Sequence, residues 1–158
     1  MIREMLGIAE GILQDLHNDH SEVDTLFDEI QDCDNGSERL RLFREVKSKL
    51  LPHLEAEQEV LYQRLEQGKS DDSRRFAHEG RSEHDVVDKQ LQKISGLGDP
   101  MSNQWEGELK VLVDLVEHHV NEEESTGFSC ARSEFDGETL EKMGDQFRKQ
   151  KQKLLQEA

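Results

Sequence analysis

The stretch LVEHHVNEEES, residues 115–125, places two adjacent histidines directly before a run of three glutamates. Residues four apart on a helix lie on one face, so His119 and Glu123 can point at a common position, as can His118 and Glu122. A solvated acidic face would account for the glutamates but not for the histidines beside them. A metal site accounts for both.

The same spacing occurs earlier in the chain, where HLEAE, residues 53–57, places His53 four residues before Glu57. A buried carboxylate without a partner costs several kcal/mol or is forced to take up a proton. A divalent cation between the imidazole and the carboxylate removes that cost. The two His-x-x-x-Glu pairs therefore predict chelation of metal.

Turn residues divide the chain into four long segments and a final charged segment. Gly combines with Asp, Asn or Ser at residues 32–38, 66–73 and 95–103, and a weaker break lies at 133–138. Each long segment has the length of a helix of six or more turns. The predicted N-caps of the second, third and fourth segments are Ser37, Ser70 and either Asp99 or Ser102.

Each long segment also carries a seam of residues spaced by three and four, as in helices that pack in bundles. The four seams are Ala9, Ile12, Leu16, His20, Val23, Phe27 and Ile30; Phe43, Val46, Leu50, His53, Glu57 and Leu61; Ala77, Gly80, His84, Val87, Leu91 and Ile94; and Trp105, Leu109, Leu112, Val116, His119 and Glu123. The sequence therefore predicts an all-α fold, an up-down-up-down four-helix bundle over residues 1–132. An additional C-terminal helix over 133–158 should pack on this domain or extend from it.

Every seam contains a histidine where the pattern calls for an apolar residue. One such histidine is more often a hydrogen-bonded core residue than a ligand, but four of them with two His-x-x-x-Glu pairs favour a metal site. In the fourth segment the stripe through Val116 continues to His119, so His118 is expected beside the seam. His17, one turn before the first seam histidine, could be a further ligand. The predicted metal ligands are His20, His53, Glu57, His84, His119 and Glu123.

The ligand types limit the choice of metal. Imidazole and carboxylate without thiolate suit iron, manganese or zinc, and two carboxylates able to bridge suit a pair of ions. There is no HExxH motif of a zinc protease, and the ferritin-type Glu-x-x-His pair is absent. The ligand types leave the choice among iron, manganese and zinc open.

Composition narrows the range of partners and locations. The net charge of −16 over 158 residues should repel nucleic acid and anionic membranes. No run of eighteen apolar residues and no signal-peptide pattern occurs. Cys33 and Cys130 form no CxxC unit, so free thiols and a cytoplasmic location are expected. A metal-free helical bundle that binds proteins through its acidic surface is the alternative to a metal protein.

The sequence resembles the hemerythrin-like, or HHE cation-binding, family. The stretches that carry the resemblance are DHSEVDTLFDEI (19–30), HLEAEQEVLYQRL (53–65), SEHDVVDKQL (82–91) and VEHHVNEEESTGFSCAR (116–132), and the segment at 134–147 is also similar. The resemblance implies a four-helix bundle with a non-haem di-iron centre. It also implies O2 or NO as the small ligand, in sensing, storage or transport.

Carried over to this sequence, the resemblance makes the six predicted residues iron ligands, with Glu57 and Glu123 bridging the two irons. One position departs from oxygen-carrying hemerythrins, which have a histidine where this chain has Gly80. The departure implies an open position for water, a small molecule or His17. It also leaves an alternative function, a di-iron enzyme that acts on peroxide or O2 or delivers iron for the repair of iron centres.

Overall fold

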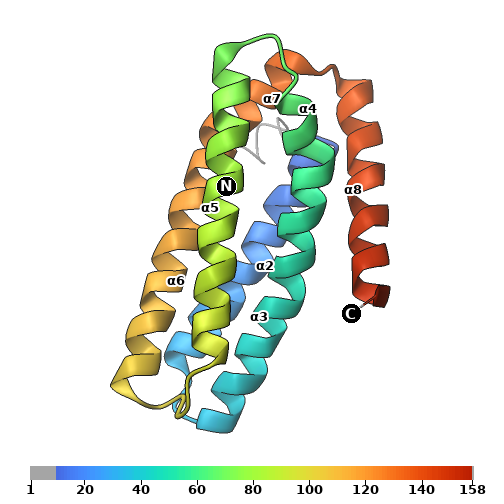
Figure 1. The fold of residues 1–158 in the computed structure, drawn as a ribbon. Helices are drawn as coiled ribbons and strands as arrows, with labels where there is room; N and C mark the ends of the chain where they lie inside the picture. The colour runs from blue at the N-terminus through green and yellow to red at the C-terminus, as the bar shows by residue number, and fades with distance from the viewer. Residues whose placement is uncertain (1–9, 158) are drawn as a thin grey trace.

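The computed structural model describes residues 10–157, so residue 158 and the first nine residues, with the predicted seam position Ala9, lie outside it. Within this range the chain is helical and contains no strand. Four long helices run up and down beside one another, and a further helix lies against the outside of the bundle (Figure 1). The predicted all-α bundle with an additional C-terminal helix is confirmed.

The second and fourth of the four long helices each contain a π-helical segment near one end. The first long helix is α2 (Ile12–Asp32), and the second comprises α3 (Gly36–Glu57), the π-helical segment η1 (Gln58–Tyr62) and α4 (Gln63–Leu65). The third is α5 (Asp71–Ser95), and the fourth comprises α6 (Asn103–Glu122), the π-helical segment η2 (Glu123–Gly127) and α7 (Phe128–Glu134). The outer helix is α8 (Gly137–Glu157). None of these helices is both long and apolar enough to cross a bilayer.

The helices begin close to where turn chemistry predicts. Ser70 and Ser102 cap α5 and α6, each accepting a hydrogen bond from the backbone N–H three residues further on. The prediction of Ser37 as a cap was wrong, because α3 begins at Gly36 and Ser37 lies within its first turn. Asn35 is the N-cap there, with its side chain accepting a hydrogen bond from a backbone N–H of that turn.

The seams form two apolar clusters with a polar layer between them. One cluster lies at the α2–α3 turn, where the Phe43 and Trp105 rings meet edge to face with centroids 5.8 Å apart. The other lies at the opposite end and includes Tyr62, Phe76 and Phe128. The burial of each large side chain contributes about 1.5–3 kcal/mol, so both ends of the bundle are strongly stabilised. Because the two clusters stabilise both ends, the layer between them can contain polar side chains.

Helix α8 packs against α2 and α3 along one side of the bundle (Figure 1). Its buried residues are Leu140, Met143, Gly144 and Phe147. Gly11, just before α2, has φ of 54°, and a Cβ there would lie 2.3 Å from the Leu140 carbonyl oxygen. Glycine is therefore required where the start of α2 meets α8.

A carboxylate clamp joins the end of α7 to the start of α5. Glu134 accepts hydrogen bonds from the backbone N–H groups of Lys69 and Ser70, at 3.0 and 3.1 Å. These bonds lower the pKa of Glu134 to about 2. A carboxylate whose pKa is lower in the folded state stabilises the fold at neutral pH.

We predict that Glu134→Gln lowers stability at pH 7 and has a smaller effect in acid. The contribution of the ionised carboxylate is complete above its ordinary pKa of 4.5 and is lost as the pH falls towards 2. Urea unfolding of both proteins between pH 7 and pH 3 measures the difference. Glu138→Gln is the control, because Glu138 is exposed and its described ion pair is with Lys142, four residues away. Equal pH dependence in the two variants would contradict a stabilising clamp.

Candidate metal centre

Four helices send histidine and glutamate side chains into the polar layer between the two apolar clusters. None of the six side chains belongs to a residue that is more than 8% exposed, and both glutamates are fully buried. The structure thus brings together all the residues predicted as ligands. They are His20 from α2, His53 and Glu57 from α3, His84 from α5, His119 from α6 and Glu123 at the start of η2.

The six residues form two overlapping groups, each of which could hold one ion. The first group is His20, His53, Glu57 and Glu123, and the second is Glu57, His84, His119 and Glu123. Within each group one ligand atom from every residue lies within 4.8 Å of the others. Both groups include both glutamates, so the two carboxylates can bridge a pair of cations.

Each glutamate reaches a histidine from the other half of the bundle. The Nε2 atom of His84 lies 2.9 Å from Glu57 Oε1, and the Nε2 atom of His20 lies 3.1 Å from Glu123 Oε1. Within the His-x-x-x-Glu pairs the gaps are larger, 3.8 Å for His53 to Glu57 and 3.5 Å for His119 to Glu123. The carboxylates therefore connect the α2–α3 half to the α5–α6 half.

Several buried ligand atoms at the centre make no hydrogen bond. They are the Nε2 atom of His20, both carboxylate oxygens of Glu57 and the Oε1 atom of Glu123. Burying such groups without partners costs several kcal/mol each, and a cation is the partner that imidazole nitrogens and carboxylate oxygens share. The donor set fits divalent metal ions.

The charges at the centre are strongly coupled. Burial raises the pKa of the Glu57 carboxyl, and the neighbouring carboxylate of Glu123 raises it further. Burial acts to lower the pKa of His20, but the adjacent carboxylates of Glu123 and Glu124 outweigh it and raise the pKa to about 9. Protons thus compensate the buried carboxylates in the metal-free protein, and metal binding must displace them.

An outer layer of hydrogen-bond acceptors fixes the orientation of each of the four histidines in the two groups. The four contacts from Nδ1 are His20 to Glu124 at 2.7 Å, His53 to Asp19 at 2.8 Å, His84 to Gln58 at 3.0 Å and His119 to Glu83 at 2.8 Å. A donating Nδ1–H leaves the Nε2 lone pair directed to the centre, which is the tautomer that binds metal.

The expected open position beside Gly80 is absent, and this prediction was wrong. A Cβ at Gly80 would lie 2.6 Å from the ring of Tyr62, so the tyrosine occupies that space. The Tyr62 hydroxyl donates to Glu123 Oε2 at 2.5 Å and lies 3.3 Å from the Nε2 atoms of His84 and His119. Burial raises the pKa of Tyr62, as do the nearby carboxylates, so the phenol keeps its proton and acts as a donor.

The seam pattern does not predict Tyr62 at the centre, because the helix changes its winding after Glu57. In η1 the backbone N–H of Gln63 bonds to the carbonyl of Gln58, five residues earlier. This wider turn brings a residue five positions after the glutamate onto the metal-facing side, where a regular α-helix would not place it. The signal that could have found Tyr62 is a large aromatic residue opposite a seam glycine.

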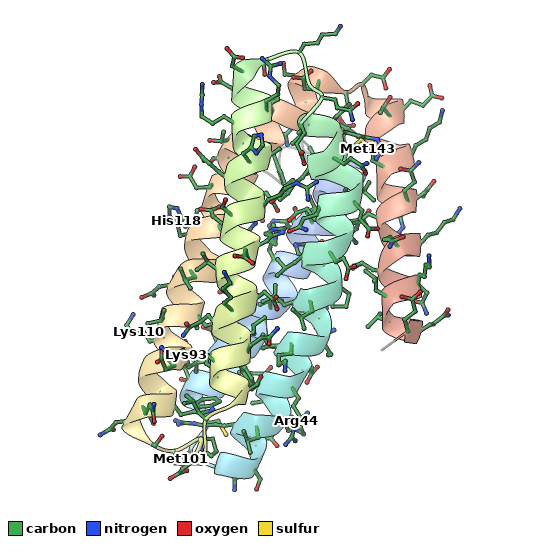
Figure 2. The ribbon with its side chains drawn as sticks, viewed as in Figure 1. Arg44, Lys93, Met101, Lys110, His118 and Met143 are labelled. Carbon is green, nitrogen blue, oxygen red and sulfur yellow. The ribbon has the colours of Figure 1, made fainter. Side chains whose placement is uncertain are left out.

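The remaining histidines that the sequence singled out lie outside both groups. His17 has its Nδ1 atom 2.9 Å from Glu124, behind His20. His118 is exposed, points away from the bundle, and lies 3.3 Å from Glu83 (Figure 2). Glu122 is also exposed, so the buried pair in the fourth helix is His119 with Glu123.

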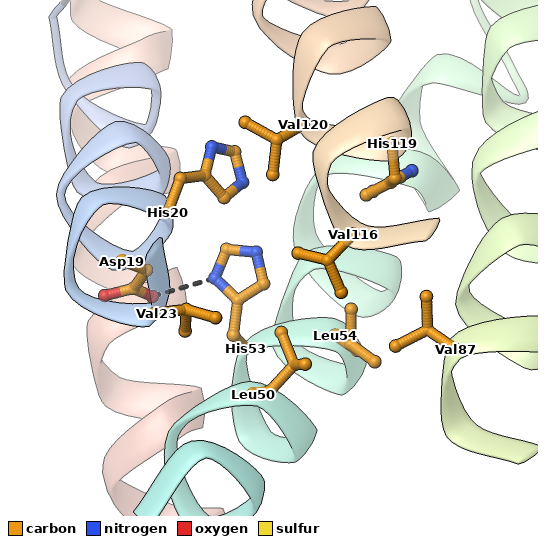
Figure 3. Close-up of a pocket in the computed structure, with 10 residues that line it drawn as sticks. All are labelled: Asp19, His20, Val23, Leu50, His53, Leu54, Val87, Val116, His119 and Val120. Atoms are coloured by element: carbon orange, nitrogen blue, oxygen red, sulfur yellow. Dashed lines mark hydrogen bonds and ion pairs between the residues drawn. The ribbon is translucent and has the colours of Figure 1, made fainter. Parts of the chain in front are cut away.

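A small apolar cavity adjoins the centre. About 10 Å³ is available there to the centre of a water-sized molecule, which is close to the minimum for one such molecule. Figure 3 shows His20, His53 and His119 at its edge and aliphatic side chains around it. Those aliphatic residues are Val23, Leu50, Leu54, Val87, Val116 and Val120.

Comparison with known proteins agrees with this geometry. Residues 11–131 match the sequence profile of the Hemerythrin HHE cation binding domain. The chain belongs to this family. Its buried histidines and glutamates are therefore the metal-binding cluster of an HHE domain.

A protein from Nostoc sp. (strain PCC 7120 / SAG 25.82 / UTEX 2576), described as a DNA nickase, is 30% identical over 138 residues. The alignment covers 87% of this chain but 38% of that protein, so the HHE chain spans well under half the length of its relative. No solved structure shows significant similarity.

We predict that Gly80→Ala destabilises the protein by about 1–3 kcal/mol, because the added methyl group overlaps the Tyr62 ring. Gly107→Ala is the matched control. Gly107 lies within α6 with no atom near its Cβ position, so alanine there should stabilise by up to about 1 kcal/mol. Urea unfolding measures both variants. A neutral Gly80→Ala would show that Tyr62 does not depend on the space beside this glycine.

We predict that Glu57→Gln removes metal binding without destabilising the metal-free protein. In EDTA its free energy of unfolding should stay within about 2 kcal/mol of the wild type, since burial already favours the uncharged form of the Glu57 carboxyl and glutamine is uncharged too. Added Zn²⁺ should raise the melting temperature of the wild type but not of the variant.

The control for this prediction is Glu55→Gln, because Glu55 is exposed on the same helix. Its response to Zn²⁺ should equal that of the wild type. If Glu57→Gln kept the same response as well, Glu57 would not be a ligand.

Proposed function

We propose that this HHE-domain protein holds a non-haem di-iron centre and binds O2 or NO there, in sensing, storage or transport. The observation that carries the proposal is the pair of four-residue groups that share Glu57 and Glu123. Two ions held by common carboxylates and separate histidines match the donor preferences of iron. We propose the six residues of the cluster as its ligands.

The cavity supports a very small ligand. It lies against His20, His53 and His119, is lined mainly by valine and leucine, and has room for about one water-sized molecule. Aliphatic walls favour an apolar diatomic molecule over an ion or a large polar substrate. The size and lining therefore support O2 or NO.

Different residues of the chain would have different roles at the centre. Iron, when bound, supplies a redox-active ion with affinity for O2 and NO. The histidines present Nε2 to the centre, because Nδ1 of each is held by its acceptor in the outer layer. The Tyr62 hydroxyl holds one oxygen of Glu123, and Val116 with its aliphatic neighbours excludes water.

Other activities have less support. The support for peroxide turnover, or for iron delivery in repair, was an open position beside Gly80. Tyr62 fills that space. Nicking of DNA, the activity named for the Nostoc relative, would require a phosphodiester to reach side chains that are nearly or fully buried. A net charge of −16 would also oppose the approach of a polyanion.

Elemental analysis of protein purified from iron-replete cells tests the proposal first. We expect about two irons per chain, since the cluster offers two groups of ligands. Anaerobic titration of the reduced protein with NO, followed by absorption spectroscopy, then tests ligand binding. Protein that holds no iron and takes up none on reconstitution would contradict the proposal.

A pair of valine variants tests whether the cavity admits the ligand. Val116→Phe should fill the cavity and weaken NO binding by about tenfold or more at unchanged iron content, because a well-packed site rejects added volume. Val111→Phe is the control, since Val111 is on the same helix and 45% exposed. Equal NO affinity in the two variants would place the ligand elsewhere.

A further inference from the structure

Helix α8 lies outside the part of the chain that matches the HHE domain, which ends at residue 131. It nevertheless covers α2 and α3, the two helices that carry His20 and His53 (Figure 1). Three of its buried residues, Leu140, Met143 and Phe147, belong to the apolar cluster that includes Tyr62 and Phe128. The contacts of α8 with His53 show what this helix adds to the domain.

One contact is between aromatic rings. The Phe147 ring is fully buried and meets the His53 imidazole edge to face, with centroids 5.7 Å apart and planes at 88°. This geometry is favourable for a pair of aromatic rings. It also limits rotation of the imidazole about its side-chain bonds.

The second contact passes through an aspartate. Lys151 Nζ donates to both oxygens of Asp19, at 2.9 and 2.8 Å, and Asp19 Oδ2 accepts from His53 Nδ1 at 2.8 Å. Figure 3 shows the Asp19–His53 bond at the edge of the cavity. Lys151 Nζ also lies 4.9 Å from the centroid of the Phe147 ring. Lysine, aspartate and phenylalanine thus form one connected support for His53.

The other three ligand histidines are held differently. The acceptors of His20, His84 and His119 are Glu124, Gln58 and Glu83, and no described ion pair joins these residues to α8. In the described part of the chain, an ion pair between an outer acceptor and α8 occurs on the His53 side alone. The first ligand group therefore depends on a helix that the second does not contact in this way.

We propose that Lys151 and Phe147 are positioning residues for the metal centre, through which α8 holds His53 in the orientation that binds metal. Lys151 neutralises Asp19 and fixes its carboxylate, and the carboxylate in turn directs Nδ1–H of His53. Phe147 blocks the alternative ring orientations. This inference rests on the proposed binding of metal by the cluster, but it does not depend on whether O2 or NO binds there.

The chain provides a matched control for Lys151. Arg148, one turn earlier on α8, pairs with Asp15, one turn earlier on α2. Both ion pairs join the same two helices, and both aspartates have side chains that are 18% exposed. Of these two ion pairs, the Lys151–Asp19 pair also contacts a proposed metal ligand, because Asp19 accepts a hydrogen bond from His53. Loss of either cation should loosen the docking of α8 alike, whereas loss of Lys151 should also affect His53.

The experiment titrates metal-free protein with Co²⁺, whose visible absorption reports the ligand geometry. We expect Lys151→Met to weaken the affinity of one site by about three- to tenfold, and Asp19→Ala by about tenfold or more, the range typical for partners of metal-binding histidines. Lys151→Arg, which keeps the cation, and Arg148→Met should both remain within about twofold of the wild type. Phe147→Leu should change the Co²⁺ spectrum.

A second measurement needs no metal. Nitrogen-15 NMR of the histidine side chains in the metal-free proteins reports whether His53 carries its proton on Nδ1. Lys151→Met should reduce that population, and Arg148→Met should not. This readout separates an effect on the imidazole from a general loss of stability.

The outcomes are distinct. Equal losses of Co²⁺ affinity in Lys151→Met and Arg148→Met, or wild-type behaviour of Lys151→Met in both measurements, would overturn the positioning role while leaving the metal centre in place. A wild-type protein that binds no Co²⁺, Zn²⁺ or iron would overturn the proposed function and this inference together.

Discussion

Two fully buried carboxylates in the middle of a helical bundle are the constraint on which the rest of this structure depends. Glu57 and Glu123 have no exposed surface, and three of their four oxygens make no hydrogen bond. Two negative charges in such a place are tolerated only with protons or cations beside them. The four histidines around them supply the means of binding cations, and the outer acceptors keep those histidines in the required tautomer.

The same constraint explains where the helices depart from α geometry. The segments η1 and η2 begin immediately after Glu57 and at Glu123 respectively, so each His-x-x-x-Glu pair is followed by a wider turn. Such segments often occur at functional sites because they redirect side chains within a continuous helix. Here the redirection brings Tyr62 over the centre, while Gly127 at the end of η2 makes room for Phe76, whose ring a Cβ would approach to 2.4 Å. Local winding therefore serves the packing around the metal layer.

Periodicity in the sequence was sufficient to predict the bundle and the six inward side chains, because burial of a seam is a local property of each helix. The stripe ending in His119 and Glu123 is buried as expected, and His118 beside it is exposed. What could not be predicted depends on contacts between distant segments. Tyr62 fills the space beside Gly80 only because one helix is π-wound, and Lys151 reaches Asp19 only because α8 folds back along α2. Asn35 rather than Ser37 caps α3 because the turn before it is shorter than its polar sequence implied.

These contacts make the two halves of the centre unequal. The end formed by His84 and His119 is closed by the Tyr62 ring, whose hydroxyl lies 3.3 Å from both Nε2 atoms. The end formed by His20 and His53 borders the aliphatic cavity, which His119 also lines, and is supported from outside by α8. A small apolar molecule in this cavity therefore meets His20, His53 and His119. Support of His53 by the Phe147 ring matters there, because the imidazole also borders the cavity, where no packed side chain holds it.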